Sequence, residues 1–209
     1  MPKQHHTEIV CIIDRSGSMS GLRHDAVVGF NTFLASQQRQ PGTASLSLIL
    51  FNHRYERVCE NVPVDAVEPL SVMSYAPNGN TALLDAVGRT IDDVGKRLAD
   101  TPEPDRPEKL LVCILTDGLE NSSLHYRPWD IKSRIEHQRL KYSWEFVYLA
   151  AGQEVFDEAK HLGIAPEFLM QVGRTPIGMT MAFNKMDDEL SFIRRNGGEA
   201  QPAEASPKT

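Results

Sequence analysis

The segment EIVCIIDRSGSM, residues 8–19, joins a continuous apolar run to a tight polar turn. Its first half, up to Ile13, is rich in β-branched residues and predicts a strand that is buried on both faces of a parallel sheet. Its second half places Asp14, Ser16 and Ser18 at alternate positions of the turn. Because open α/β sheets bind ligands at the carboxyl ends of their strands, this turn is a candidate binding site.

The side-chain oxygens of this turn suit a hard divalent cation. Mg²⁺ prefers about six oxygen ligands and usually retains several waters. The alternative is an ordinary strand-to-helix turn in which a serine hydroxyl only caps the following helix. The turn by itself fits both alternatives, and the rest of the chain favours the metal site.

Strand-like and helix-like patterns alternate along the chain and predict an α/β fold. Strands are expected at residues 8–13, 44–51, 55–62, 109–116, 144–149 and 168–172, and helices at 22–38, 83–98, 128–141, 154–162 and 176–195. Because residues 52–54 form a short turn, the strand after them is expected to return antiparallel at the edge. The expected architecture is a Rossmann-like, doubly wound and mostly parallel sheet of about six strands, with one antiparallel edge strand and helices on both faces.

The composition is that of an ordinary globular domain. Of 209 residues, 41% are hydrophobic and 24% are charged, and a domain over residues 8–195 is long enough to bury a full core. Residues 1–7 are expected to be flexible. Residues 196–209, rich in Gly, Pro, Ala and Glu, are expected to form a disordered tail.

Charge and cysteine content exclude several classes of protein. The net charge of −6 argues against nucleic acid or an anionic membrane as the main partner. No apolar stretch approaches the roughly 20 residues of a spanning helix, and the N-terminus lacks the apolar core of a signal peptide. Cys11, Cys59 and Cys113 lack the spacing of a disulfide framework or a zinc site. A cytoplasmic protein fits these features best.

Two further segments place oxygen ligands at the same edge of the predicted sheet. Residues 116–118, Thr-Asp-Gly, follow the second very apolar strand, and residues 78–81, Asn-Gly-Asn-Thr, precede the second long helix. Because the most apolar strands are the innermost ones, Asp14 and Asp117 should face each other across one crevice. Each segment alone also fits a plain turn, and Thr81 also fits a helix N-cap. The convergence of three segments with only hard oxygen ligands favours a metal site.

With these residues the sequence resembles the von Willebrand factor A domain family and its metal-ion-dependent adhesion site, over about residues 8–195. The family pattern is Asp-x-Ser-x-Ser, a distant Thr and then a distant Asp. The matching residues are Asp14, Ser16, Ser18, Thr81 and Asp117. The resemblance implies that these five residues bind a divalent cation. Mg²⁺ is the expected ion, and Mn²⁺ or Ca²⁺ are the alternatives. The chain looks like a compact, stand-alone bacterial or phage cytoplasmic version of such a domain.

The function implied by the resemblance is metal-dependent binding of a partner protein. When the hydroxyls of Ser16, Ser18 and Thr81 occupy the inner coordination sphere, one or both aspartates bind through water, and the cation keeps an open position. A partner's Asp or Glu carboxylate can fill that position, and low dielectric inside an interface strengthens the bond. The chain itself is taken to be a monomer.

Eight further residues are expected around the metal, as rim residues that contact the partner or as groups that orient a water or a ligand. They are Arg15 and Met19 on the first loop, Tyr75 and Asn78 on the second, and Glu120, Asn121, His125 and Tyr126 on the third. Packing within the loops is the alternative explanation for each of them.

The competing hypothesis is a Mg²⁺-dependent enzyme that acts on a phosphate or another small molecule. A haloacid dehalogenase-type phosphotransferase needs a second Asp where Ser16 stands, and the glycine patterns of P-loops and dinucleotide-binding folds are missing. A metallohydrolase would need histidines or further carboxylates near the metal, but His24 and His125 lack ligand spacing. No catalytic residue is therefore expected.

Overall fold

The computed structural model describes residues 3–162 and 169–196. Within these two ranges, six strands form one sheet in the order β3-β2-β1-β4-β5-β6. They are β1 (Lys3–Asp14), β2 (Thr43–Phe51), β3 (Tyr55–Pro63), β4 (Pro107–Thr116), β5 (Glu145–Ala151) and β6 (Leu169–Val172). Neighbouring strands pair in parallel except β2 and β3, which are antiparallel. The predicted fold class, including the antiparallel edge strand, is confirmed.

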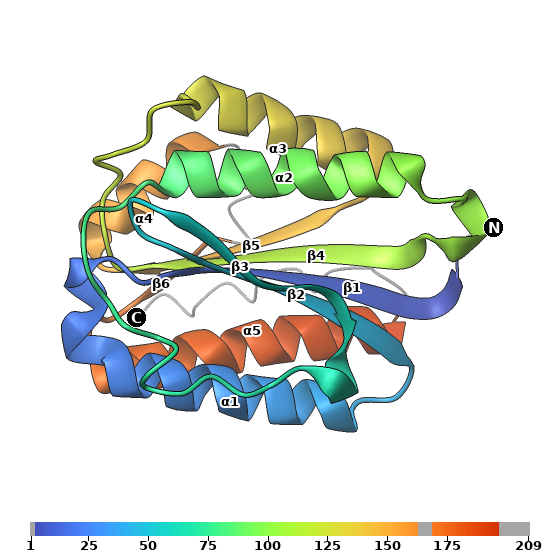
Figure 1. The fold of residues 1–209 in the computed structure, drawn as a ribbon, viewed down its shortest axis with the longest axis horizontal. Helices are drawn as coiled ribbons and strands as arrows, with labels where there is room; N and C mark the ends of the chain where they lie inside the picture. The colour runs from blue at the N-terminus through green and yellow to red at the C-terminus, as the bar shows by residue number, and fades with distance from the viewer. Residues whose placement is uncertain (1–2, 163–168, 197–209) are drawn as a thin grey trace, which may run out of the picture.

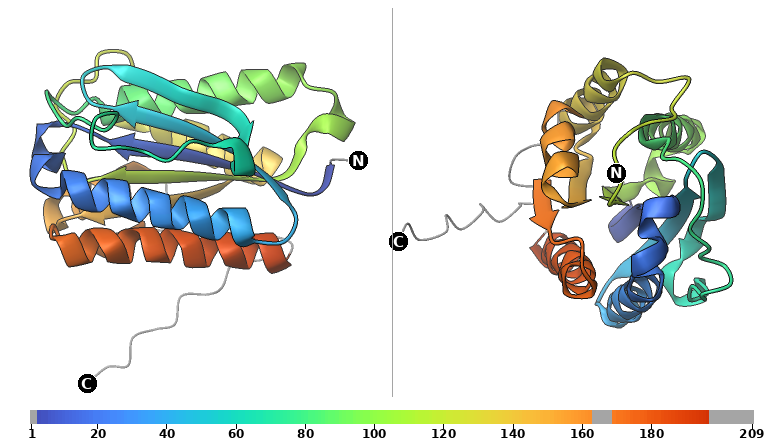
Figure 2. Two further views of the ribbon diagram at one scale, coloured as in Figure 1. Left: turned by 60° about the horizontal axis from the view of Figure 1, so that its bottom comes forward. Right: turned by 90° about the vertical axis from the view of Figure 1, so that its left-hand side faces the viewer.

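Helices cover both faces of the sheet. The helix α1 (Arg23–Arg39) packs beside α5 (Pro176–Asn196) on one face, and α2 (Leu83–Asp100), α3 (Pro128–Tyr142) and α4 (Gln153–Ala159) cover the other (Figure 1). The short 3-10 segments are η1 (Gly17–Leu22), η2 (Val64–Ala66), η3 (Glu103–Asp105) and η4 (Lys160–Leu162). The end-on view in Figure 2 shows the sheet between its two helical layers. Within the described residues, no helix is long and apolar enough to cross a membrane.

The two central strands explain where the core and the site lie. Residues 9–13 of β1 and 110–115 of β4 are all buried, because helices cover both faces of the sheet at its centre. The chain winds outward from β1 to β3 and then crosses back to β4 on the other side of β1. The topological switch point therefore lies between the carboxyl ends of β1 and β4, as the sequence predicts.

The N-terminal strand is longer than expected. The strand β1 begins at Lys3, and His6 pairs with Thr43 of β2, whereas the sequence predicts a flexible segment over residues 1–7. The strand continues because backbone hydrogen bonding to β2 does not require apolar side chains. The expected tail begins at Asn196, the last residue of α5, and residues 197–209 lie outside the described part of the chain.

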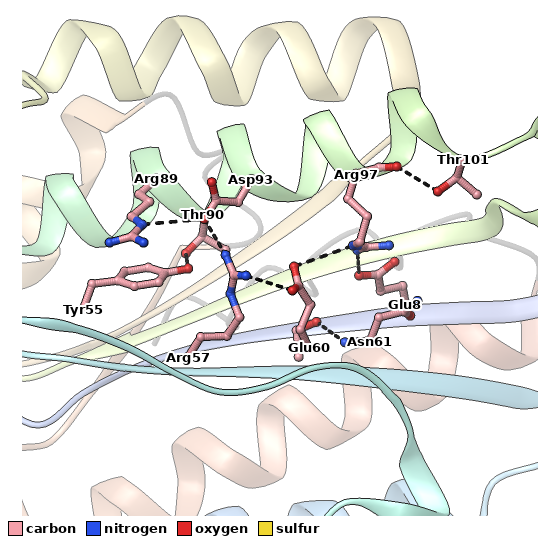
Figure 3. A network of polar contacts seen from close by, with 11 residues as sticks. Glu8, Tyr55, Arg57, Glu60, Asn61, Arg89, Thr90, Asp93, Arg97 and Thr101 are labelled. Atoms are coloured by element: carbon pink, nitrogen blue, oxygen red, sulfur yellow. Dashed lines mark hydrogen bonds and ion pairs between the residues drawn. The ribbon is translucent and has the colours of Figure 1, made fainter.

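A network of ion pairs holds the edge strand β3 against α2 (Figure 3). Arg57 of β3 pairs with Glu60 at 2.8 Å and with Asp93 of α2 at 2.5 Å. Arg97 of α2 pairs with the carboxylate of Glu8, which is buried in β1. Burial raises the pKa of Glu8, and the guanidinium of Arg97 opposes that rise. The charged form of Glu8 therefore depends on Arg97.

Substitution of Arg97 by alanine should lower the free energy of unfolding at pH 7 by about 3 kcal/mol, because it leaves a buried carboxylate without its counter-ion. Since Arg97 opposes the rise in the pKa of Glu8, its removal raises that pKa further, and the folded variant binds this proton more tightly than the folded wild type does. The difference in the free energy of unfolding between the variant and the wild type should therefore shrink as the pH falls from 7 towards 5, measured by urea unfolding at both values. Arg89→Ala, which removes a surface contact to Asp93, is the control and should cost less than about 1 kcal/mol. A deficit that does not change with pH would contradict this role of Arg97.

Candidate metal centre

Three loops meet at the switch point. Residues 15–22 follow β1, residues 67–82 lead into α2, and residues 117–127 follow β4. The first and third loops lie at the end of the sheet where the parallel strands finish, on the left in Figure 1, and the second reaches the same end after running along α1 from the opposite side. Convergence of these loops at one rim follows from the strand order.

Backbone hydrogen bonds join the first loop to the second. The N–H of Gly17 donates to the carbonyl of Gly79 at 2.9 Å, and the N–H of Asn78 donates to the carbonyl of Arg15 at 2.9 Å. Gly79 has a φ of +72°, a left-handed conformation that glycine adopts without strain. The two loops are therefore fixed relative to each other by main-chain contacts.

Asp14 ends β1 as a fully buried carboxylate. Its Oδ1 accepts the N–H of Ser16 at 2.6 Å, and its Oδ2 accepts the hydroxyl of Thr116 at 2.6 Å. Burial raises the pKa of Asp14 to about 6, although these hydrogen bonds oppose the rise. The carboxylate is thus held in one orientation and lies in surroundings that disfavour its charge.

A chain of hydroxyl contacts runs from the first loop to Asp117. The hydroxyls of Ser16 and Ser18 are 2.8 Å apart, and the Ser18 hydroxyl donates to Oδ1 of Asp117 at 2.5 Å. The Asp117 side chain is buried, and its Oδ2 accepts Nε of Arg174 at 3.0 Å. Ser16 is the N-cap residue of η1 but makes no capping hydrogen bond through its side chain. The serine-cap alternative therefore does not explain this turn.

Gly118 and Thr81 complete the arrangement. A Cβ placed on Gly118 would lie 2.8 Å from Oγ1 of Thr81, 3.1 Å from Oγ of Ser18 and 3.4 Å from Oδ2 of Asp14. The missing side chain therefore leaves a space that is bounded by oxygen atoms of different loops. Thr81 is not the N-cap of α2, because that position belongs to Ala82.

The structure thus brings all five predicted ligand residues together. Four of them, Ser16, Ser18, Thr81 and Asp117, line one open cleft of about 450 Å³. Among the described residues, no group of three or more His, Cys, Asp or Glu side chains could hold a metal ion. The oxygen donors that meet here are two carboxylates and three hydroxyls, the type of ligand that hard divalent cations prefer.

Two of the expected rim residues are buried instead. Met19 and Tyr75 have no exposed surface and belong to the hydrophobic core, so the expectation that they contact a partner is wrong. Apolar side chains of this size gain more by packing under the loops than by lining them. The Tyr75 hydroxyl donates to the main-chain carbonyl of Asp14, and burial raises the pKa of this hydroxyl well above its usual range. Tyr75 therefore fixes the end of β1 from the side of the hydrophobic core.

Two more of the expected rim residues connect elements. The guanidinium of Arg15 turns away to Glu56 of β3, 2.5 Å from its carboxylate. Asn78 is exposed, and its Oδ1 and main-chain carbonyl accept the amide of Asn52. Arg15 thus connects the first loop to β3, and Asn78 connects the second loop to the β2–β3 turn.

The remaining four of the eight expected rim residues lie on the third loop. Asn121 lines the metal cleft, and its Oδ1 accepts the N–H of Thr81 at 2.9 Å. The carboxylate of Glu120 accepts the N–H of Leu84 at 2.9 Å and so caps α2 rather than facing the cleft. His125 and Tyr126 line a neighbouring cleft of about 600 Å³ beside the β2–β3 turn. These two were expected to flank the metal, and the structure places them elsewhere because Asp85 draws their loop onto α2.

Asp85 anchors that part of the third loop. Its Oδ2 accepts the N–H of Leu124 at 2.8 Å, and its Oδ1 accepts the N–H groups of His125 at 2.9 Å and Tyr126 at 3.0 Å. Three backbone donors are thus satisfied by one carboxylate in the first turn of α2. The sequence indicates only an acidic residue that is favourable near a helix N-terminus.

Three further residues have roles at the site that were not predicted from the sequence. Thr116 orients Asp14, Gly118 leaves the space for the oxygens, and Arg174 pairs with Asp117. Thr116 and Gly118 directly flank Asp117. Arg174 follows β6, whose carboxyl end lies at the same edge of the sheet, so strand order was the signal that could have found it.

Comparisons with known proteins agree with the fold. No protein-family model and no curated protein matches the chain. Solved von Willebrand factor A domain structures match it over most of its length. The vWF domain of the type V pili tip protein Mfa5 from Porphyromonas gingivalis superposes with a TM-score of 0.62 at 10% identity, covering 95% of this chain and 98% of that one.

Some of the similar solved structures contain a metal. Proximal thread matrix protein 1 from the mussel byssus, with a zinc-occupied MIDAS motif, matches with a TM-score of 0.61 at 16% identity, covering 89% of this chain and 46% of that one. Manganese-loaded TRAP protein from Plasmodium vivax matches with a TM-score of 0.58 at 14% identity, covering 88% of this chain and 71% of that one. The chain spans less than half of the length of the mussel protein. At these identities the comparisons establish the von Willebrand factor A fold.

Replacing Asp85 by alanine should destabilise the protein by about 2 kcal/mol, because three backbone donors lose their acceptor. Amide hydrogen exchange at residues 124–126 should rise by more than it does elsewhere in the third loop. The control is Asp25→Ala, in the first turn of α1, for which no backbone acceptor role is found among the described residues. Unchanged exchange at residues 124–126 in Asp85→Ala would contradict the anchoring role.

Proposed function

We propose that this chain is a metal-dependent protein-interaction module. In this proposal a divalent cation is held by Asp14, Ser16, Ser18, Thr81 and Asp117, and it binds a carboxylate of a partner protein. The observation that carries the proposal is the space at Gly118 of the third loop, towards which Ser18 and Asp14 of the first segment and Thr81 of the second direct oxygen atoms. The interacting unit is proposed to be the single domain over residues 8–195.

The charges of the site support this proposal. Asp14 and Asp117 are buried carboxylates, and burial disfavours the charged form of Asp14. Hydroxyl oxygens add ligands without adding charge, so a divalent cation that meets one or both carboxylates only through water would keep its attraction for a further anion. Hard oxygen donors favour Mg²⁺, with Mn²⁺ or Ca²⁺ as alternatives. When bound, the cation supplies an electrophilic position that is open to an anionic ligand.

The surroundings of the cleft favour binding over catalysis. His125 lines the neighbouring cleft, and His24 is exposed on α1, so neither of the two histidines weighed for an enzyme lines the metal cleft. The names of structurally similar proteins point in the same direction, since they include a pilus tip protein and a thread matrix protein. A partner protein with an exposed Asp or Glu is therefore the proposed ligand.

The metal half of the proposal is tested by Mn²⁺ titration followed by electron paramagnetic resonance. The wild type should bind one ion, and Gly118→Ala should bind it at least about tenfold more weakly, because the new methyl group displaces the Thr81 hydroxyl. Gly21→Ala is the matched control, since a Cβ there meets nothing within 4 Å. Equal affinity of Gly118→Ala and the wild type would contradict the proposed ligand set.

The carboxylate half is tested by the water-proton relaxivity of the Mn²⁺-loaded protein. Acetate should lower the relaxivity by replacing a metal-bound water, whereas chloride at the same ionic strength should not. A relaxivity that acetate leaves unchanged would mean that the bound ion offers no position to a carboxylate.

A further inference from the structure

Arg174 reaches into the metal cleft from the loop between β6 and α5. Its Nε lies 3.0 Å from Oδ2 of Asp117 and donates a hydrogen bond to it. The Asp117 side chain is fully buried, whereas 52% of the Arg174 side chain is exposed. The guanidinium is therefore a solvent-accessible cation that contacts one of the proposed metal ligands directly.

Both carboxylate oxygens of Asp117 already have donors. The Ser18 hydroxyl donates a hydrogen bond to Oδ1 at 2.5 Å, and Nε of Arg174 donates one to Oδ2. A metal ion at this site would interact with the Asp117 carboxylate, directly or through water. The guanidinium of Arg174 interacts with the same negative charge. Two positive groups beside one buried carboxylate also repel each other, so each weakens the binding of the other.

We propose that Arg174 is an internal counter-ion that competes with the divalent cation for Asp117 and that it binds the anionic ligand when the cation takes its place. This inference rests on the proposed metal site and adds a second anion-binding group to it. An arginine suits both roles, because its planar fork binds carboxylates in a fixed geometry and always carries its charge. The ligand class is a carboxylate that contacts the cation and the guanidinium together.

Competition of this kind couples the two binding events. A carboxylate that draws Arg174 away from Asp117 removes the competitor of the metal, so it raises the affinity for the metal beyond the effect of direct coordination. By linkage, the metal raises the affinity for the carboxylate by the same factor. A merely structural ion pair between Arg174 and Asp117 would stabilise the fold without this coupling.

The inference is tested by measuring Mn²⁺ dissociation constants by electron paramagnetic resonance. Arg174→Ala should bind Mn²⁺ about fivefold more tightly than the wild type, the size expected for loss of a half-exposed ion pair. Arg174→Lys keeps the charge and should stay close to the wild type. Lys160→Ala is the control, because it removes the same charge from a surface pair with Asp157 on α4, and it should shift the constant less than about twofold.

The coupling has its own measurement. Acetate should tighten Mn²⁺ binding more in the wild type than in Arg174→Ala, and the Nε–H resonance of Arg174 should move when Mg²⁺ is added to ¹⁵N-labelled protein. Equal or weaker Mn²⁺ binding by Arg174→Ala would overturn the inference while leaving the metal site intact. Failure of every variant and of the wild type to bind Mn²⁺ would overturn the metal site and the inference together.

Discussion

Two buried carboxylates, Asp14 at the end of β1 and Asp117 directly after β4, lie at the same edge of the sheet, and the surrounding structure has to accommodate their charge. Asp14 receives hydrogen bonds from Ser16 and Thr116, and Asp117 receives them from Ser18 and Arg174. Hydrogen bonds alone offset only part of the cost of burying a carboxylate. This cost explains why neutral hydroxyls, rather than further acids, surround the pair.

The elements around the site hold it in shape from outside the cleft. Tyr75 fixes the end of β1 from the core, and Asn121 fixes the main chain of Thr81. Glu120 and Asp85 tie the third loop to the first turn of α2. A site built from three loops thereby gains the rigidity of the sheet and helix that carry them, which lowers the entropic cost of ordering its side chains on binding.

The sequence was sufficient for the fold, and it predicted that five oxygen-bearing residues lie at the switch point, where the structure has them. Apolar runs identified β1 and β4 as central strands, and the alternation of patterns predicted the doubly wound sheet that the structure has. The same patterns could not predict which loop residues turn inward. Met19 and Tyr75 are buried because the loops fold back onto the core, and Arg174 reaches the site only because β6 lies at the same edge. Such contacts depend on tertiary packing between distant segments, and no local pattern encodes them.

Diffraction from crystals soaked in MnCl₂, measured at the manganese absorption edge, would locate a bound ion directly. We expect one anomalous peak between Ser16, Ser18, Thr81 and Asp117, with Asp14 close to it and the Arg174 guanidinium displaced from Asp117. A structure of the soaked crystals without a peak at this place, and with the Arg174–Asp117 pair intact, would contradict this expectation.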